Sequence, residues 1–226
     1  MSAPTRLAVF DCDGTLVDGQ ADVCWAMERA FERAGLASPD PREVRRIIGL
    51  SLPVAISKLA PDLSEHKTSD VTEFYKSSFR ARREEGLLGE PLYDGIADLL
   101  AGLHRDGWQL AVATGKSDRG LAACLAQHEI DHLFISLQTA DRHPSKPHPA
   151  MLEAAIHEAG ATPTQAVMIG DTTFDMLMAR SAGVCAIGVS WGYHSPGELL
   201  AGGAKSIAET TADLAVQLDE ILSSQA

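Results

Sequence analysis

Two carboxylates stand one residue apart at the end of an apolar run near the amino terminus. The run covers residues 7–10, and Asp11 and Asp13 follow it directly. A β-strand directs residues i and i+2 to the same side, so these like charges are expected to lie close together. A divalent cation with hard oxygen ligands commonly holds such a pair. The sequence Asp-x-Asp-Gly also suits an ordinary turn, so the pair alone leaves both interpretations open.

Further polar groups stand at or just beyond the ends of other expected strands. They are Thr114 with Gly115, then Lys146 in a loop with three prolines, and then Asp171 with Asp175. Because parallel strands end on the same side of a sheet, these groups are expected to meet at one rim. Carboxylates for a metal, a hydroxyl, backbone N–H groups and an ammonium are the equipment for handling a phosphoryl group. Carboxylate oxygens favour Mg²⁺ over Zn²⁺, and no His/Cys cluster offers an alternative site.

The elements that position these residues alternate between strands and helices. Continuous apolar strands separated by helices predict an α/β fold, a Rossmann-like parallel sheet covered on both faces. Strands are expected at residues 7–10, 110–113, 133–135, 166–169 and 184–189. Helices are expected between and after them at residues 96–104, 119–127, 150–159, 176–181 and 211–222.

An interval without a convincing strand follows the first strand. Apolar residues recur there at helical spacing, and helices are expected at residues 21–35, from Pro41, at 52–59 and at 71–85. We therefore expect an all-helical cap domain at residues 17–88, inserted into a core made of residues 1–16 and 89–226. An insertion after a strand lies over its carboxyl end, where ligands bind in open α/β sheets, so it is a candidate lid.

Composition narrows the class of protein. The 226 residues include 19 basic and 31 acidic residues, a net charge of −12, which argues against nucleic acid and anionic membranes as partners. No apolar run approaches membrane-spanning length, and the amino terminus does not resemble a signal peptide. The four cysteines have no metal-ligand spacing and are expected to be free thiols. We expect a cytoplasmic protein, a monomer or homodimer.

Four segments together resemble the motifs of the haloacid dehalogenase-like hydrolases. They are FDCDGTLVD (residues 10–18), ATGKS (113–117), SKPHP (145–149) and IGDTTFDM (169–176), in the family's order. The resemblance covers essentially the whole chain and is closest to the phosphoglycolate phosphatase-like branch with a helical cap. It implies a phosphatase that acts through an aspartyl-phosphate intermediate and requires Mg²⁺.

The resemblance also implies a role for each residue at the rim. Asp11 would be the nucleophile, and Asp13 would protonate the leaving oxygen, deprotonate the attacking water and offer its carbonyl to the metal. Asp171 would complete the shell of metal ligands. Thr114, Gly115 and Lys146 would bind the phosphoryl group of the substrate. Thr114 and Lys146 would also take part in catalysis, and Asp175 and Gly14 would support the site.

The carboxylate at Asp13 favours phosphate monoesters, whose leaving alkoxide needs a proton. A sugar phosphomutase of the same family carries both Asp residues and is the alternative enzyme. As the resemblance has it, that branch places a His about ten residues beyond the second Asp, where this chain has none. A non-catalytic protein that binds a phosphate ligand is the alternative of another class, but no core carboxylate is missing.

The cap is expected to select the substrate, a small phosphorylated metabolite such as phosphoglycolate or a sugar phosphate. Two basic groups stand in this interval, and most of their members are expected on solvated faces: Arg42, Arg45 and Arg46, and then Lys76, Arg80, Arg82 and Arg83. The sharper hypothesis is that Arg45 or Arg46, near the Gly49 turn, meets a second anionic group of that substrate. Lys116 is expected at a solvent-exposed or rim position without a catalytic role. The role of His194 stays open.

Overall fold

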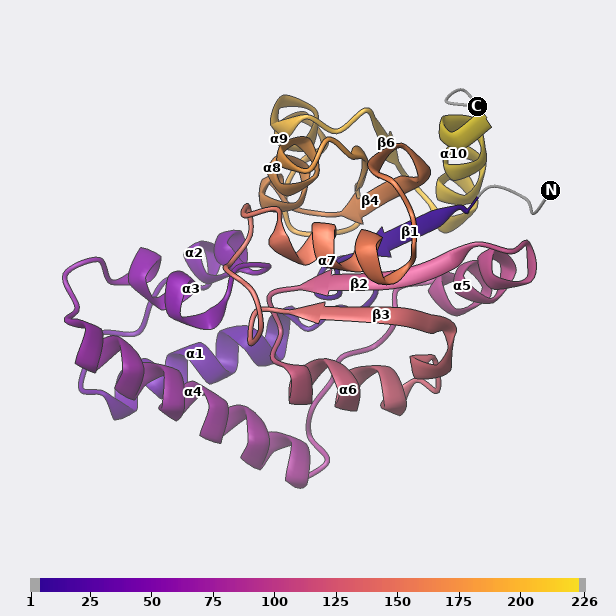
Figure 1. Ribbon diagram of the computed structural model, residues 1–226. Helices are drawn as coiled ribbons and strands as arrows, with labels where there is room; N and C mark the ends of the chain where they lie inside the picture. The colour runs from indigo at the N-terminus through magenta and orange to yellow at the C-terminus, as the bar shows by residue number, and fades with distance from the viewer. Residues whose placement is uncertain (1–4, 224–226) are drawn as a thin grey trace.

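The computed structural model describes residues 5–223, and within them a six-stranded sheet forms the centre of the molecule (Figure 1). All paired strands are parallel, in the order β3-β2-β1-β4-β5-β6. Their bounds are β1 Leu7–Phe10, β2 Gln109–Thr114, β3 Phe134–Thr139, β4 Ala166–Gly170, β5 Cys185–Val189 and β6 Ser206–Ala208. The Rossmann-like α/β fold expected from the sequence is confirmed.

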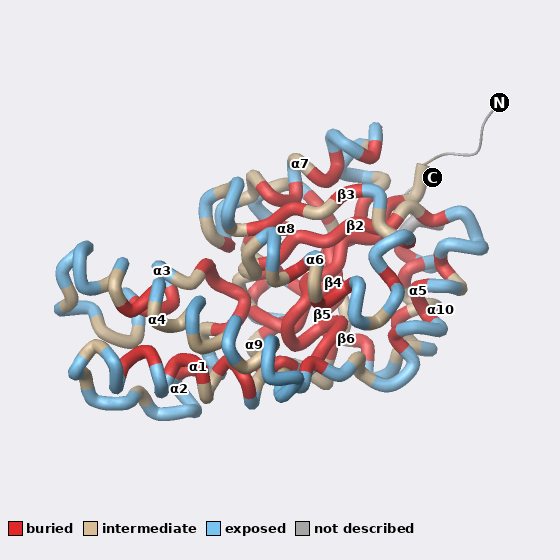
Figure 2. Tube along the Cα trace, turned by 90° about the horizontal axis from the view of Figure 1, so that it is seen from below, coloured by how far each residue is buried: buried red, intermediate tan, exposed pale blue. Residues whose placement is uncertain are grey.

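Helices cover both faces of the sheet because each central strand is apolar on both sides. Ala8 and Phe10 of β1 pack into a cluster with α5, α6 and α10, whereas Leu7 and Val9 pack against α7, α8 and α9. Figure 2 shows the buried residues following the strands through the middle of the molecule. The helices are α5 Ile96–Arg105, α6 Asp118–Gln127, α7 Ala150–Glu158, α8 Thr173–Ser181, α9 Pro196–Gly202 and α10 Thr211–Ser223, with single 3₁₀ turns at Asp131–Leu133 and Pro163–Gln165.

The interval between β1 and α5 holds four helices, which lie beyond the end of the sheet toward which the strands point (Figure 1). Apolar side chains of this interval form a core of their own, which includes Val23, Met27, Phe31, Ile56 and Val71. The helices are α1 Gln20–Arg33, α2 Pro41–Ile47, α3 Leu52–Leu59 and α4 Glu65–Glu84. The division into domains at residues 16/17 and 88/89 stays a prediction.

Three local expectations were incomplete. Helix α4 begins at Glu65, whereas the sequence predicted residue 71, because the first turns are polar and give no apolar periodicity. The Ser64 side chain accepts a hydrogen bond from the Lys67 N–H and so caps the helix. Strand β3 runs to Thr139, past two polar residues that pair with each other, Gln138 and Ser136. Helix α9 and strand β6 were not predicted.

Within residues 5–223, no helix is both long and apolar enough to cross a membrane.

Candidate active site

The centre of the site is a fully buried ion pair between Asp11 and Lys146. Asp11 follows β1, and its backbone N–H donates to the Ile169 carbonyl of β4, which continues the sheet by one residue. Its Oδ1 accepts a hydrogen bond from the Cys12 N–H at 2.6 Å, and its Oδ2 lies 2.9 Å from Lys146 Nζ. Lys146 also donates to Asp175 Oδ1 at 2.6 Å, so one ammonium holds two carboxylates.

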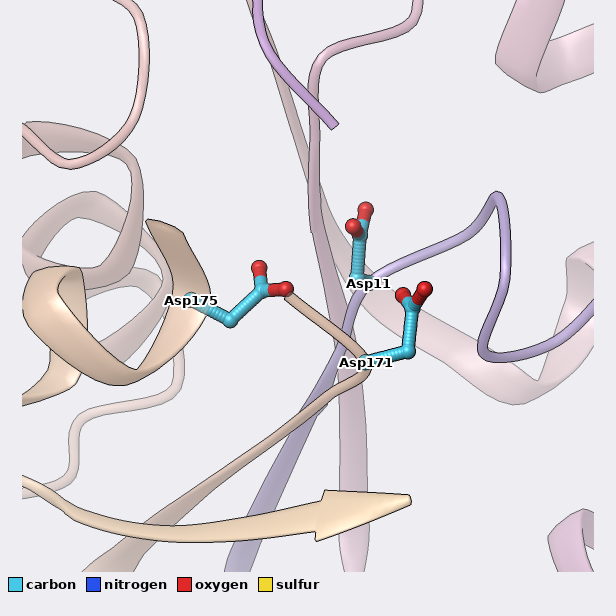
Figure 3. A group of neighbouring side chains, drawn as sticks. All are labelled: Asp11, Asp171 and Asp175. Carbon is cyan, nitrogen blue, oxygen red and sulfur yellow. The ribbon is translucent and has the colours of Figure 1, made fainter. Parts of the chain in front are cut away.

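Asp171, after β4, brings a third carboxylate to the same point (Figure 3). Its Oδ1 accepts a hydrogen bond from the Thr15 hydroxyl at 3.0 Å, and its Oδ2 accepts one from the Tyr193 N–H at 2.9 Å. A Cβ on Gly14, whose φ is +81°, would lie 2.1 Å from Asp171 Oδ2. Only glycine therefore fits at position 14, which supports the site by admitting this carboxylate.

Asp13 contacts a different lysine. Its Oδ1 lies 3.0 Å from Lys116 Nζ, and the same ammonium lies 2.5 Å from Glu90 Oε1. The Lys116 side chain is 8% exposed, so it is not solvent-exposed, and it lines the cavity at the rim, which was the other expected position. Two acidic partners compensate the buried charge of Lys116: Asp13 after β1, and Glu90, which lies 77 residues further along in the linker between α4 and α5. The local sequence gives no sign of the contact with Glu90.

Thr114 and Gly115 meet the helical insertion at the end of β2. Thr114 is buried and accepts a hydrogen bond from the Lys116 N–H at 3.3 Å, while Ser117 caps α6. A Cβ on Gly115 would lie 2.5 Å from the Leu50 carbonyl oxygen and 2.6 Å from that of Gly49. The backbone of the insertion therefore lies directly on the core at this point, in a closed arrangement.

A cavity of about 530 Å³ opens between the insertion and the core on the side of Asp13. Its lining includes Asp13 but not Asp11, Lys146 or Asp171. Apolar side chains of α1 and of the α2–α3 loop form one part of the wall. Basic side chains form another part, at the rim between α4 and α6: Lys76, Arg80, Arg83, Lys116 and Arg119.

Arg46 lies outside this cavity wall. Its guanidinium pairs with Glu198 Oε1 at 2.6 Å, and its side chain is 60% exposed. Its neighbour Arg45 donates to the Gly192 carbonyl at 3.3 Å. His194 accepts a hydrogen bond from the Thr173 N–H and contacts the Arg46 carbonyl at 3.1 Å. These contacts fasten the insertion to the core, and the expectation that Arg45 or Arg46 meets a second anionic group of the substrate stays a prediction.

Burial dominates the electrostatics of the carboxylates. It raises the pKa of Asp11 to about 7, although Lys146 opposes the shift. Burial also raises the pKa of Asp13 against the opposing charge of Lys116, and it raises the pKa of Asp171, with further contributions from Asp175 and Asp11. For Lys146, burial lowers the pKa, but Asp11 and Asp175 outweigh it and the pKa is raised. The cluster therefore favours a cation.

The donor set fits a hard divalent cation. Asp11, Asp171 and Asp175 each offer a carboxylate oxygen, and these oxygens lie within 4.8 Å of one another. Both oxygens of Asp175 already accept hydrogen bonds, one from Lys146 and the other from the hydroxyl and N–H of Thr172. The oxygens of Asp11 and Asp171 contact donors as well, so these contacts do not rank the three carboxylates as metal ligands. Asp175 has the shorter of the two contacts to the Lys146 ammonium.

Fold and site together define a hydrolase of the phosphoryl-transfer type, with acidic and basic groups gathered at the carboxyl ends of parallel strands. The family description "Haloacid dehalogenase-like hydrolase" matches residues 8–189, and the chain belongs to that family. It is 35% identical over 213 residues to "Probable phosphatase IndB" of Dickeya dadantii, a match that covers 92% of this chain and 91% of the relative.

Two further comparisons agree. A phosphoglycolate phosphatase of Pseudomonas fluorescens is 31% identical over 196 residues, which cover 84% of this chain and 71% of that protein. The crystal structure of a hydrolase from Pseudomonas syringae superposes with a TM-score of 0.85 at 26% identity, covering 96% and 99% of the two chains. The expected family, its phosphoglycolate phosphatase-like branch and the enzyme class, a phosphoric monoester hydrolase, are confirmed.

Proposed function

We propose that this protein is a Mg²⁺-dependent phosphatase that hydrolyses a small phosphate monoester through a phosphorylated Asp11. The observation that carries the proposal is the placement of two carboxyl groups with different surroundings. Asp11 lies against Lys146 and Asp171, where a phosphoryl group and a cation would meet. Asp13 lines the cavity, where a leaving group would fit.

In the first half of the reaction, an Asp11 oxygen attacks phosphorus and the bond from phosphorus to the ester oxygen breaks. Asp13 gives its proton to that departing oxygen, which leaves as the alcohol. In the second half, water attacks phosphorus, Asp13 takes the water's proton, and the bond to Asp11 breaks. The sum is ester plus water giving alcohol plus phosphate, with both carboxyl groups restored.

The remaining residues would bind charge. Lys146 and the Thr114 hydroxyl would bind phosphoryl oxygens, with the Gly115 N–H beside them. Asp11, Asp171 and the Asp13 carbonyl would hold Mg²⁺, which would offset the negative charge between the carboxylates and the phosphate. A carboxylate cluster this acidic would otherwise repel the anionic substrate.

The cavity favours a leaving group larger than a few atoms, since its volume lies within the roughly 300–1,000 Å³ of typical ligand pockets. Among the described residues, neither Arg80 nor Arg119 has an ion-pair partner, and both line the cavity. We infer that these two residues, rather than Arg46, would meet a second anionic group of the substrate. The enzyme would act on free metabolites in the cytoplasm.

A panel of phosphate monoesters tests this function. Inorganic phosphate should appear with Mg²⁺ and not after chelation, and Asp11→Asn should abolish its release. Transfer of the phosphoryl group within a sugar phosphate, without free phosphate, would instead identify a mutase. Binding without turnover of any ester would identify a binding protein.

A further inference from the structure

The buried contact between Asp13, Lys116 and Glu90 is not explained by the proposed roles of the site residues. Lys116 Nζ lies 3.0 Å from Asp13 Oδ1 and 2.5 Å from Glu90 Oε1. The three side chains are 11%, 8% and 0% exposed in the order Asp13, Lys116, Glu90. Burying three ionisable groups carries a large desolvation penalty, so ordinary surface pairing does not account for the arrangement.

Among residues 5–223, Lys116 is the one cationic side chain that forms an ion pair with the Asp13 carboxyl. The backbone at Gly19 also lies close to the Asp13 carboxyl, since a Cβ on Gly19 would lie 2.7 Å from Asp13 Oδ1. The orientation of the Asp13 side chain therefore depends on where the Lys116 ammonium is held. Lys116 itself follows Thr114 and Gly115, and its N–H donates to the Thr114 hydroxyl oxygen.

Glu90 fixes that ammonium. A lysine side chain has four rotatable carbon–carbon bonds and moves freely unless its end is bound. Glu90 is held by contacts from two directions: Arg83 of α4 donates to Oε2 at 3.3 Å, and the His128 ring contacts the Glu90 carbonyl at 2.7 Å. The next residue back, Gly89, donates its N–H to Asp22 of α1 at 2.6 Å.

We propose that Lys116 and Glu90 are positioning residues that direct the Asp13 carboxyl toward the leaving oxygen. The inference rests on the proposed phosphatase function and adds to it. Because Arg83 of helix α4 binds Glu90, the orientation of Asp13 also depends on the position of α4. The Asp13 carboxyl is therefore oriented for proton transfer when the helical insertion lies on the core. In this proposal Lys116 and Glu90 act on the reaction through Asp13.

The test compares two esters of similar size with different leaving groups, 4-nitrophenyl phosphate and benzyl phosphate. The value of kcat/KM reports the steps up to departure of the alcohol, since the phosphorylated enzyme forms irreversibly at that point. A nitrophenolate leaves without a proton, whereas a benzyl alkoxide needs one. General-acid catalysis typically contributes about 10²–10⁴-fold.

Lys116→Met should therefore lower kcat/KM for benzyl phosphate by about 100-fold and for 4-nitrophenyl phosphate by less than about 5-fold. Glu90→Gln should show the same selectivity with a smaller loss, and Lys116→Arg should retain more activity on benzyl phosphate than Lys116→Met. Lys58→Met, on the exposed face of α3, is the matched lysine control and should leave both values unchanged.

Equal losses on both esters, or no loss on either, would overturn the positioning role and leave Lys116 as a structural ion-pair residue. If Lys116→Met does not fold, Glu90→Gln decides by the same comparison. Wild-type protein that releases phosphate from neither ester in the presence of Mg²⁺ would instead contradict the phosphatase function itself. The two failures are thus distinguishable.

Discussion

Replacing Lys146 by Met should destabilise the protein strongly, because Lys146 is the one cation among residues 5–223 that pairs with the buried carboxylates of Asp11 and Asp175. Lys146 lies 2.9 Å from Asp11 and 2.6 Å from Asp175, and all three side chains are fully buried. Removing one partner of a buried ion pair typically lowers the free energy of unfolding by about 3–5 kcal/mol. For a chain of this length each kcal/mol shifts the melting temperature by roughly 2–4 °C, so a loss of roughly 6–20 °C is expected.

The loss should depend on pH in a defined direction. Burial raises the pKa of Asp11 above its unfolded value, so between about pH 4 and pH 7 the folded chain binds more protons than the unfolded chain. Stability from this group is therefore present at low pH and falls as the pH rises through that interval. Without Lys146 the pKa of Asp11 rises further, so the deficit of the variant should be larger near pH 7.5 than near pH 5.

Thermal unfolding followed by circular dichroism, with and without Mg²⁺, measures these effects. Mg²⁺ should recover part of the lost stability, since it supplies positive charge to the same carboxylates. Lys58→Met is the control for loss of an exposed lysine and should melt with the wild type. A Lys146→Met variant that melts within about 2 °C of the wild type at both pH values would refute the reasoning.

Three further outcomes are expected. Gly115→Ala would place a methyl group 2.5 Å from the Leu50 carbonyl oxygen and should raise KM about 10-fold in steady-state assays. Gly197→Ala, whose methyl group meets nothing within 4 Å, is the control and should leave KM unchanged. Equal KM values for the two variants would contradict a closed contact at Gly115. Arg46→Ala breaks an exposed ion pair and should change the free energy of unfolding by less than about 1 kcal/mol, with the ranking of substrates unchanged. Arg119→Gln should raise KM for monoesters with a second anionic group and not for 4-nitrophenyl phosphate, and a uniform effect would remove Arg119 from substrate recognition.

The apolar pattern of the sequence predicted β1, β2, β4 and β5 because these strands are short, continuous and buried on both faces. The edge strands β3 and β6 are less buried, and they were predicted too short and not at all, respectively. The carboxyl ends of β1, β2 and β4 then brought Asp11, Thr114 and Asp171 together, as parallel topology requires. Helix α9 could also have been found, since Ser195-Pro196 followed by Glu198 is a capping box, and the structure shows both of its hydrogen bonds.

Other features depend on contacts that no local pattern encodes. Glu90 is a single acid in a Gly/Pro linker, and its pairing with Lys116 arises only when the insertion folds back on the core. Thr15 and the Tyr193 N–H, which orient Asp171, were missed for the same reason. The sequence did not show which basic residues line the cavity, because helical periodicity does not tell which of several exposed arginines faces the core.

The most direct test of the account is a pre-steady-state burst measured with the Asp13→Asn variant. With 4-nitrophenyl phosphate the first half of the reaction needs no proton donor, whereas the second half lacks its base, so the phosphorylated enzyme should accumulate. We expect a Mg²⁺-dependent burst of about one nitrophenolate per protein molecule, with a hydroxylamine-labile phosphoryl group on the peptide that contains Asp11. Active wild-type protein whose Asp13→Asn variant gives no burst, or carries the label on another residue, would contradict the assignment of Asp11 as the nucleophile.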